Sequence, residues 1–140
     1  MPGIIDADRL TKTYKGSVPA LANASFHVDK GEFVTLIGRS GSGKSTLLNI
    51  LGCLDRPDSG QLTMDGSIVN FSDPKQLVDI RRSKIGFIFQ QFNLLPYLTA
   101  QENVEYPLLF NYRDPAARAR VAGELLRRVG LYDRRTHHPS

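Results

Sequence analysis

Apolar and polar residues follow different patterns in the two parts of this 140-residue chain. In the first part they form short segments typical of β-strands. Residues 4–14 predict an extended segment, and the alternation over residues 22–28 predicts a half-buried strand. FVTLI (33–37) and KIGFIFQ (84–90) are short apolar runs rich in β-branched or aromatic residues, as in strands buried on both faces. The chain up to about Gln90 is therefore predicted to be rich in β-structure.

Three further elements are predicted in this first part. Asp65-Gly66 is a strong turn signal between the short segments 61–64 and 67–69, so a β-hairpin is expected there. Residues 77–82 predict a short helix. A second helix is predicted over residues 44–54, because four leucines recur at helical spacing: Leu47, Leu48, Leu51 and Leu54.

After residues 84–90, the spacing of apolar and polar residues becomes that of helices. Thr99-Ala100-Gln101-Glu102 has the sequence of a capping box, so a helix should start there, and Pro107 should end or kink it. Asp114-Pro115 has a capping residue followed by proline at the first helical position, which predicts another helix start. Gly130 is a suitable stop for that helix, whose apolar face is expected from four residues spaced four apart: Ala117, Val121, Leu125 and Val129.

One stretch between the predicted elements cannot contribute to a core. GRSGSGKST (38–46) matches the phosphate-loop pattern G-x-x-x-x-G-K-[ST] and stands between a predicted strand and a predicted helix, which is the context that this motif requires. Glycine leaves room for backbone N–H groups to point at one place, and a helix N-terminus adds unpaired N–H groups with a partial positive charge. The residues expected to cradle a polyphosphate are Gly38, Ser40, Gly41, Ser42, Gly43, Lys44, Ser45 and Thr46.

The last three of these residues have distinct expected roles. The ammonium of Lys44 should reach the β- and γ-phosphates, the hydroxyl of Ser45 should bind Mg²⁺, and Thr46 should lie near the α- or β-phosphate. ATP and Mg²⁺ are thus the expected cofactors. A flexible Gly/Ser loop is the alternative interpretation of the same residues. A dinucleotide fingerprint is excluded because Thr46 stands where it needs glycine, and the spacing does not form a G-x-S-x-G nucleophile elbow.

Composition and charge exclude only a few kinds of binding site and of partner. The net charge of +4 suits an anionic partner but does not choose among nucleotides, nucleic acids and membranes. The single cysteine, Cys53, excludes an intrachain disulfide and a cysteine-based metal site. No apolar run approaches the roughly 18 residues of a membrane span, and the first ten residues do not resemble a secretory signal. The arginines of the last predicted helix have no interleaved aromatic residues, so no nucleic-acid partner is expected.

Two long stretches carry a family resemblance. GRSGSGKSTLLNILGCLDRPDSGQLTMDG and IGFIFQQFNLLPYLTAQENV strongly resemble ATP-binding cassette (ABC) ATPases, and the similarity covers residues 4–140. Within that family the chain looks most like the group that powers lipoprotein release and macrolide export. The resemblance implies an α/β fold with a phosphate-loop NTPase core, an N-terminal antiparallel β subdomain and an incomplete helical subdomain. It places the nucleotide-binding core at residues 1–90 and the partial helical subdomain at residues 91–140.

The resemblance also implies roles for residues outside the loop. Tyr14 matches the aromatic residue that stacks on adenine, and an edge-strand tyrosine is the alternative interpretation. Gln90 matches the glutamine that contacts Mg²⁺ or the attacking water, and it is expected to act with Lys44 in catalysis; a plain strand-end polar residue is the alternative. Residues 99–104 fall where the family contacts its membrane subunits, or they are only a capped helix.

The chain departs from the family in one large respect. The LSGGQ signature and an apolar run ending in Asp-Glu are both absent. The resemblance implies that this Asp-Glu pair would supply the second Mg²⁺ ligand and the water-positioning group, and that the signature of a second protomer would complete each site. We therefore expect a full-length parent that hydrolyses ATP to drive export or extraction through permease subunits. That parent is expected to be a homodimer, cytoplasmic and peripheral on the inner face of the cell membrane. The chain itself is expected to bind ATP without hydrolysing it.

Two other functions remain open on the sequence. One is an ABC-like assembly switch in cell division or envelope regulation, in which ATP controls association with a membrane protein. The other is a cytosolic ABC protein that acts on ribosomes or DNA, although such proteins usually carry two cassettes.

Overall fold

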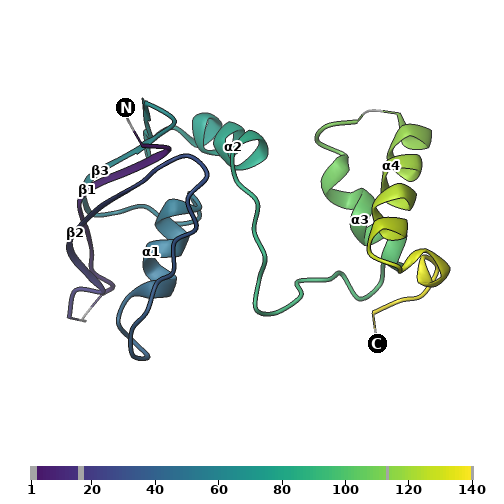
Figure 1. The fold of residues 1–140 in the computed structure, drawn as a ribbon, viewed down its shortest axis with the longest axis horizontal. Helices are drawn as coiled ribbons and strands as arrows, with labels where there is room; N and C mark the ends of the chain where they lie inside the picture. The colour runs from purple at the N-terminus through teal and green to yellow at the C-terminus, as the bar shows by residue number, and fades with distance from the viewer. Residues whose placement is uncertain (1–2, 16–17, 113, 140) are drawn as a thin grey trace. The chain divides into compact units, whose positions relative to one another are not determined.

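A computed structural model of the chain describes residues 3–15, 18–112 and 114–139. The described residues form two compact units, one extending to Phe87 and one beginning at Ile88 (Figure 1). The first unit contains a β-sheet and the helices α1 (Lys44–Leu51) and α2 (Pro74–Ser83). The second unit is helical.

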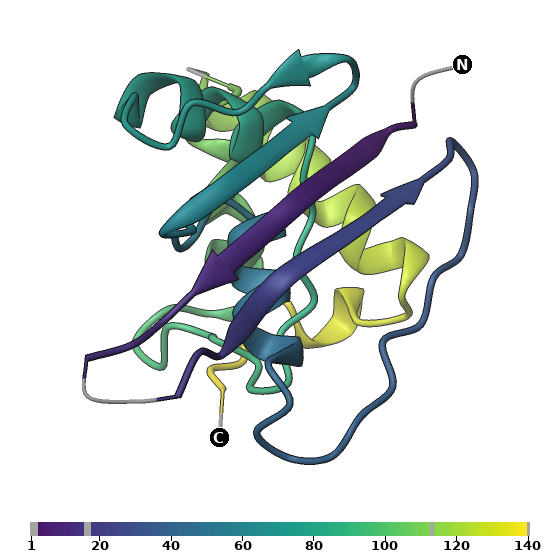
Figure 2. The same cartoon turned by 90° about the vertical axis from the view of Figure 1, so that its left-hand side faces the viewer.

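The sheet of the first unit has four antiparallel strands in the order β2-β1-β3-β4. The strands are β1 (Ile5–Lys12), β2 (Leu21–Val28), β3 (Ser59–Met64) and β4 (Ser67–Ile68). Figure 2 shows β1 between its two long neighbours. The predicted extended segments in this region are confirmed, and so is the hairpin: Asp65 and Gly66 both have positive φ, 50° and 74°, which suits the tight turn between β3 and β4.

The core lies between the sheet and α1. Leu10, Ile50 and Leu62 are the largest fully buried side chains, and they come from β1, α1 and β3. On α1 the leucine pattern was only partly right, because Leu48 is 53% exposed and Leu54 lies beyond the end of the helix and is 51% exposed. Ile50 is fully buried instead, because it lies one helical turn after Leu47 and faces the same side of the helix.

The two predicted buried strands are wrong. Residues 33–37 and 84–90 are not strands in the structure, and Phe33, Ile37 and Ile88 are 94%, 91% and 102% exposed. A strand is stable only when its backbone groups pair with a neighbour, and neither run has a strand partner among the described residues. Both runs are apolar, as expected of buried strands, but among the described residues neither is paired with a neighbouring strand that would bury it.

The second unit contains α3 (Ala100–Leu108), α4 (Pro115–Arg128) and the short 3-10 helix η1 (Tyr132–Arg134). The capping box at Thr99 is confirmed, and α3 ends one residue after Pro107. Asp114 caps α4 by accepting hydrogen bonds from the first-turn N–H groups, as predicted. Gly130, with φ of 71°, follows the end of α4.

The buried face of α4 differs from the prediction. Ala122, Gly123 and Leu126 are buried, whereas Leu125 and Val129 are 40% and 66% exposed. The reason is tertiary: the ring of Tyr132 packs beside Gly123, at a distance where a Cβ would make an ordinary van der Waals contact. Two guanidinium groups lie over the same ring, with centroid distances of 3.9 Å for Arg127 and 4.6 Å for Arg135.

Candidate phosphate-binding site

The phosphate loop leads directly into α1, at the end of the long connection from β2 (Figure 2). Gly43 is the N-cap residue and makes no side-chain cap hydrogen bond, and the first turn of α1 contains no acidic residue. The first intrahelical bond runs from Leu47 N–H to Gly43 C=O over 2.8 Å. The preceding N–H groups, including those of Ser45 and Thr46, have no intrahelical acceptor and are suited to an anion.

Glycine is required in this loop for two separate reasons. Gly41 and Gly43 have φ of 77° and 88°, which side chains other than glycine rarely adopt. A Cβ at Gly43 would in addition collide with the carbonyl oxygen of Ala20, whereas a Cβ at Gly41 would meet nothing within 4 Å. At Gly38 a Cβ would lie 2.5 Å from the Oγ of Ser42, inside the turn.

The Lys44 side chain lies against the loop. Its ammonium donates to the carbonyl oxygens of Gly38 and Arg39, both at 2.8 Å, and to the Oγ of Ser42 at 3.4 Å. These three contacts match the three donors of an ammonium group. The positive charge is therefore held beside the glycine backbone, and a bound polyphosphate would take over at least one of these donors. The residues present fit a phosphate chain.

Tyr14 lies just beyond β1 and is 43% exposed. Its hydroxyl donates to Oδ2 of Asp55 at 2.9 Å, and the ammonium of Lys12 lies 5.3 Å from the centroid of its ring. The same ammonium donates to Oδ1 of Asp55 at 2.9 Å and to the carbonyl oxygen of Arg56 at 2.7 Å. Sequence reasoning missed Lys12 and Asp55, because no local pattern pairs residues that are 43 positions apart.

The pKa of Asp55 results from opposing effects. Partial burial of the carboxylate raises its pKa, but hydrogen bonds from Lys12, from Tyr14 and from the N–H of Arg56 favour the charged form. The net result is a pKa below the ordinary value, so Asp55 is ionised at neutral pH and holds the buried ammonium of Lys12.

Gln90 is exposed and follows the apolar run 85–89. It belongs to the second unit, whereas the phosphate loop belongs to the first, so its contact with Mg²⁺ or water stays a prediction. Among the described residues, no group of three or more histidine, cysteine, aspartate or glutamate side chains is arranged to hold a metal ion.

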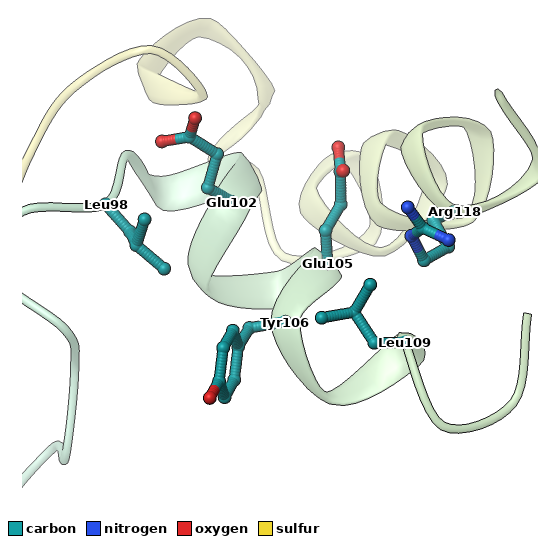
Figure 3. Close-up of a pocket in the computed structure, with 6 residues that line it drawn as sticks. All are labelled: Leu98, Glu102, Glu105, Tyr106, Leu109 and Arg118. Carbon is teal, nitrogen blue, oxygen red and sulfur yellow. The ribbon is translucent and has the colours of Figure 1, made fainter. Parts of the chain in front are cut away.

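The second unit has a pocket of about 180 Å³ on α3. Five of its lining residues come from α3 or its flanks, and Arg118 comes from α4 (Figure 3). The pocket combines apolar side chains with the carboxylates of Glu102 and Glu105. This volume is below the roughly 300–1,000 Å³ of typical small-molecule sites, so a nucleotide is not expected in it. No described helix is both long and apolar enough to cross a membrane.

Comparison with known protein families gives a match that includes the phosphate loop. The model of the family described as ABC transporter matches residues 21–140. The chain belongs to the ABC transporter family. The predicted family resemblance is thus confirmed, and the match includes the whole phosphate loop.

Several curated ABC proteins are similar to the chain. An uncharacterized ABC transporter ATP-binding protein of Methanocaldococcus jannaschii, MJ0796, is 48% identical over 96% of this chain and 60% of that protein. The macrolide export ATP-binding/permease protein MacB of Marinobacter nauticus is 43% identical over 98% of this chain and 22% of that protein. This ABC chain therefore spans about three fifths or less of these relatives.

Solved ABC cassettes have the same fold. A dimeric structure of the MJ0796 cassette in a post-hydrolysis state, bound to ADP and Pi, has a TM-score of 0.86 at 46% identity, covering 96% of this chain and 61% of that chain. A second dimeric structure of MJ0796 has a TM-score of 0.83 at 48% identity, covering 96% of this chain and 60% of that chain. These likenesses confirm the predicted α/β phosphate-loop NTPase class.

Proposed function

We propose that this chain is the ATP-binding part of an ABC transporter. In the full-length parent, ATP binding and hydrolysis would be coupled to export or extraction of a substrate through a membrane partner. The observation that carries the proposal is the complete phosphate loop, in which the Lys44 ammonium lies among loop acceptors at the open N-terminus of α1. A similarity to macrolide export proteins supports export as the direction of transport.

Each part of the loop has a task in this proposal. The N–H groups at the start of α1 and the Lys44 ammonium bind the phosphates, while the glycines keep side chains out of their way. The hydroxyl of Ser45, at the first turn of the same helix, would hold Mg²⁺, which neutralises phosphate charge. Gln90 would contact Mg²⁺ or orient the water, and residues 1–90 and 91–140 would be the core and the helical subdomain.

The Lys44→Ala variant tests the binding site. Loss of a charged hydrogen bond removes roughly 1.5–3 kcal/mol, so ATP with Mg²⁺ should bind at least about tenfold more weakly by isothermal titration calorimetry. Lys75→Ala, on the exposed surface of α2, is the matched control and should bind like the parent. Equal ATP affinity in Lys44→Ala and the parent protein would rule out the assignment.

Turnover is a separate part of the proposal. Residues 1–140 contain neither LSGGQ nor an apolar run ending in Asp-Glu, so the groups that would complete the Mg²⁺ site and position the water are missing from this segment. Purified residues 1–140 should therefore release no phosphate above background. Steady phosphate release that Lys44→Ala abolishes would contradict this expectation.

The proposed partners are integral membrane permease subunits and a second copy of the full-length parent. Support for a permease comes from MacB of Marinobacter nauticus, an ATP-binding/permease protein by name, and support for a dimer comes from the dimeric MJ0796 cassettes. The second unit exposes Phe92, Tyr97 and Phe110 at 87%, 70% and 67%, which suits contact with an apolar segment of a partner. The protein would then lie on the cytoplasmic face of the membrane.

Co-purification with a membrane subunit, followed by reconstitution in vesicles, tests this arrangement. ATP-dependent movement of a substrate supports a transporter. ATP-dependent association without movement of any substrate would favour an assembly switch instead. Recovery of the full-length protein without a membrane subunit, at every nucleotide state, would contradict both.

A further inference from the structure

The end of β1 holds a buried cation. Lys12 is 8% exposed, and its ammonium donates to the Asp55 carboxylate and to the carbonyl oxygen of Arg56. Burying an ammonium is costly unless a counter-charge and hydrogen bonds accompany it, and both are present. Asp55 uses its second oxygen, Oδ2, to accept the hydroxyl of Tyr14 at 2.9 Å.

The segment after α1 also fixes the backbone on both sides of this network. The Thr13 N–H donates to Oδ2 of Asp58 at 2.7 Å, and the Asp58 N–H donates to the Thr11 carbonyl oxygen at 2.8 Å. The backbone before Tyr14 and the hydroxyl at the tip of its ring are therefore both held. With the Lys12 ammonium over the ring at 5.3 Å, the aromatic side chain is fixed while remaining 43% exposed.

Helix α1 connects this network to the phosphate loop. The N–H groups of Leu54 and Asp55 both donate to the Asn49 carbonyl oxygen, at 2.8 and 3.2 Å, so Asp55 is anchored to the C-terminal end of α1. The phosphate loop occupies the N-terminal end of the same helix. One rigid element thus sets the position of the Tyr14 ring relative to the phosphate-binding N–H groups.

We propose that Asp55, supported by Lys12, is a positioning residue that orients the Tyr14 ring as a platform for the nucleobase. The proposal rests on the function proposed above, because it needs a nucleotide whose phosphates occupy the loop. Stacking on an aromatic face is favourable for any base, and a ring that is already fixed loses less freedom when the base arrives. Asp55 acts through Tyr14 and does not itself contact the nucleotide.

The test compares two ligands that differ by the nucleoside. ATP and inorganic tripolyphosphate, each with Mg²⁺, are titrated into the full-length protein by calorimetry. Tyr14→Phe keeps the aromatic face but removes the hydroxyl that Asp55 holds. We expect about two- to fivefold weaker ATP binding in this variant, with tripolyphosphate affinity unchanged. Tyr97→Phe, at a tyrosine that is 70% exposed, is the matched control and should change neither affinity.

A double-mutant cycle separates positioning from a general structural effect. Asp55→Asn should weaken ATP binding selectively, and adding it to Tyr14→Phe should cause little further loss, because both changes break the same link. Additive losses, or equal losses for ATP and tripolyphosphate, would overturn the proposal. If Asp55→Asn fails to fold, Tyr14→Phe remains decisive, since unchanged ATP affinity in that variant also overturns it. Failure of the proposed function looks different, because tripolyphosphate would then bind Lys44→Ala and the parent protein equally.

Discussion

At the scale of single residues, the phosphate loop shows how glycine can be required for conformation alone or for conformation and space together. Gly41 and Gly43 both have positive φ, but only Gly43 lies against other backbone, at Ala20. The two positions look alike in the motif and differ in the folded chain. This difference leads to a measurable contrast in stability.

Gly43→Ala should lower the free energy of unfolding more than Gly41→Ala. Each alanine is placed in a left-handed conformation, at a cost of about 1–2 kcal/mol. At Gly43 the backbone of Ala20 must also move, which adds roughly 1–3 kcal/mol of overpacking. Urea unfolding of both variants measures the difference. Equal losses would mean that the close approach to Ala20 is not present in solution.

At the scale of elements, each helix with a side-chain cap begins where the sequence places a capping residue. Thr99 accepts a hydrogen bond from the Glu102 N–H at 3.3 Å, and the Glu102 carboxylate accepts from the Thr99 N–H at 2.8 Å. Asp73 and Asp114 cap α2 and α4 by accepting hydrogen bonds from first-turn N–H groups, and each precedes a proline. Because capping depends on neighbouring residues only, it is the feature that sequence predicts best.

Thr99→Ala should loosen the start of α3. Removing an N-cap hydroxyl costs about 1 kcal/mol, which corresponds to roughly fivefold less protection of the first-turn amides from hydrogen exchange. Thr99→Ser retains the hydroxyl and serves as the control, with protection close to that of the parent. Unchanged exchange in Thr99→Ala would show that the cap does not limit opening of α3.

The capping box also makes the stability of α3 depend on pH. Hydrogen bonds from the Thr99 N–H and hydroxyl hold the pKa of Glu102 below its ordinary value of 4.5. The folded pKa is lowered, so this contribution is fully present above pH 4.5 and is lost as the pH falls through the folded pKa. NMR titration of the Glu102 carboxyl should show this lower pKa, and Thr99→Ala, which removes the hydroxyl but keeps the backbone N–H, should return it part of the way toward 4.5. A Glu102 pKa that does not respond to Thr99→Ala would show that the Thr99 hydroxyl does not contribute to the lowered pKa.

At the scale of the whole molecule, the chain leaves large apolar side chains in contact with water. Residues 33–37 and 85–89 have the composition of inner strands but no strand partner among the described residues, and Phe33, Ile37 and Ile88 are more than 90% exposed. Such segments favour association, because contact with another chain would remove their exposed apolar side chains from water.

Purified residues 1–140 should accordingly show marginal stability and concentration-dependent association by light scattering. The double variant Phe33→Ser and Ile37→Ser should associate less, whereas Val18→Ser, at a residue that is 85% exposed but outside these runs, should behave like the parent. A sharp cooperative melt of a monomer would contradict this prediction.

One part of the candidate site depends on neighbouring residues, and another part depends on residues that are distant in the sequence. The phosphate loop and the start of α1 were predictable residue by residue, since nine consecutive residues contain the glycines, the lysine and the hydroxyl groups. The network around Tyr14 was not, because Lys12 and Asp55 meet only after β1 and the end of α1 are packed together. The buried faces of α1 and α4 were misjudged for a related reason, as with Leu48 and Leu125.

The sequence by itself determined the features that depend on nearby residues: the family, the phosphate loop, the Asp65-Gly66 hairpin and the helix starts at Thr99 and Asp114. The tertiary structure decided which side chains are buried, which runs form strands and which charges pair. Caps and turns are governed by hydrogen bonds over a few residues, whereas burial and strand pairing depend on a partner that is distant in sequence. For that reason FVTLI has the composition of a buried strand and is exposed, and Lys12 has the charge of a surface residue and is buried.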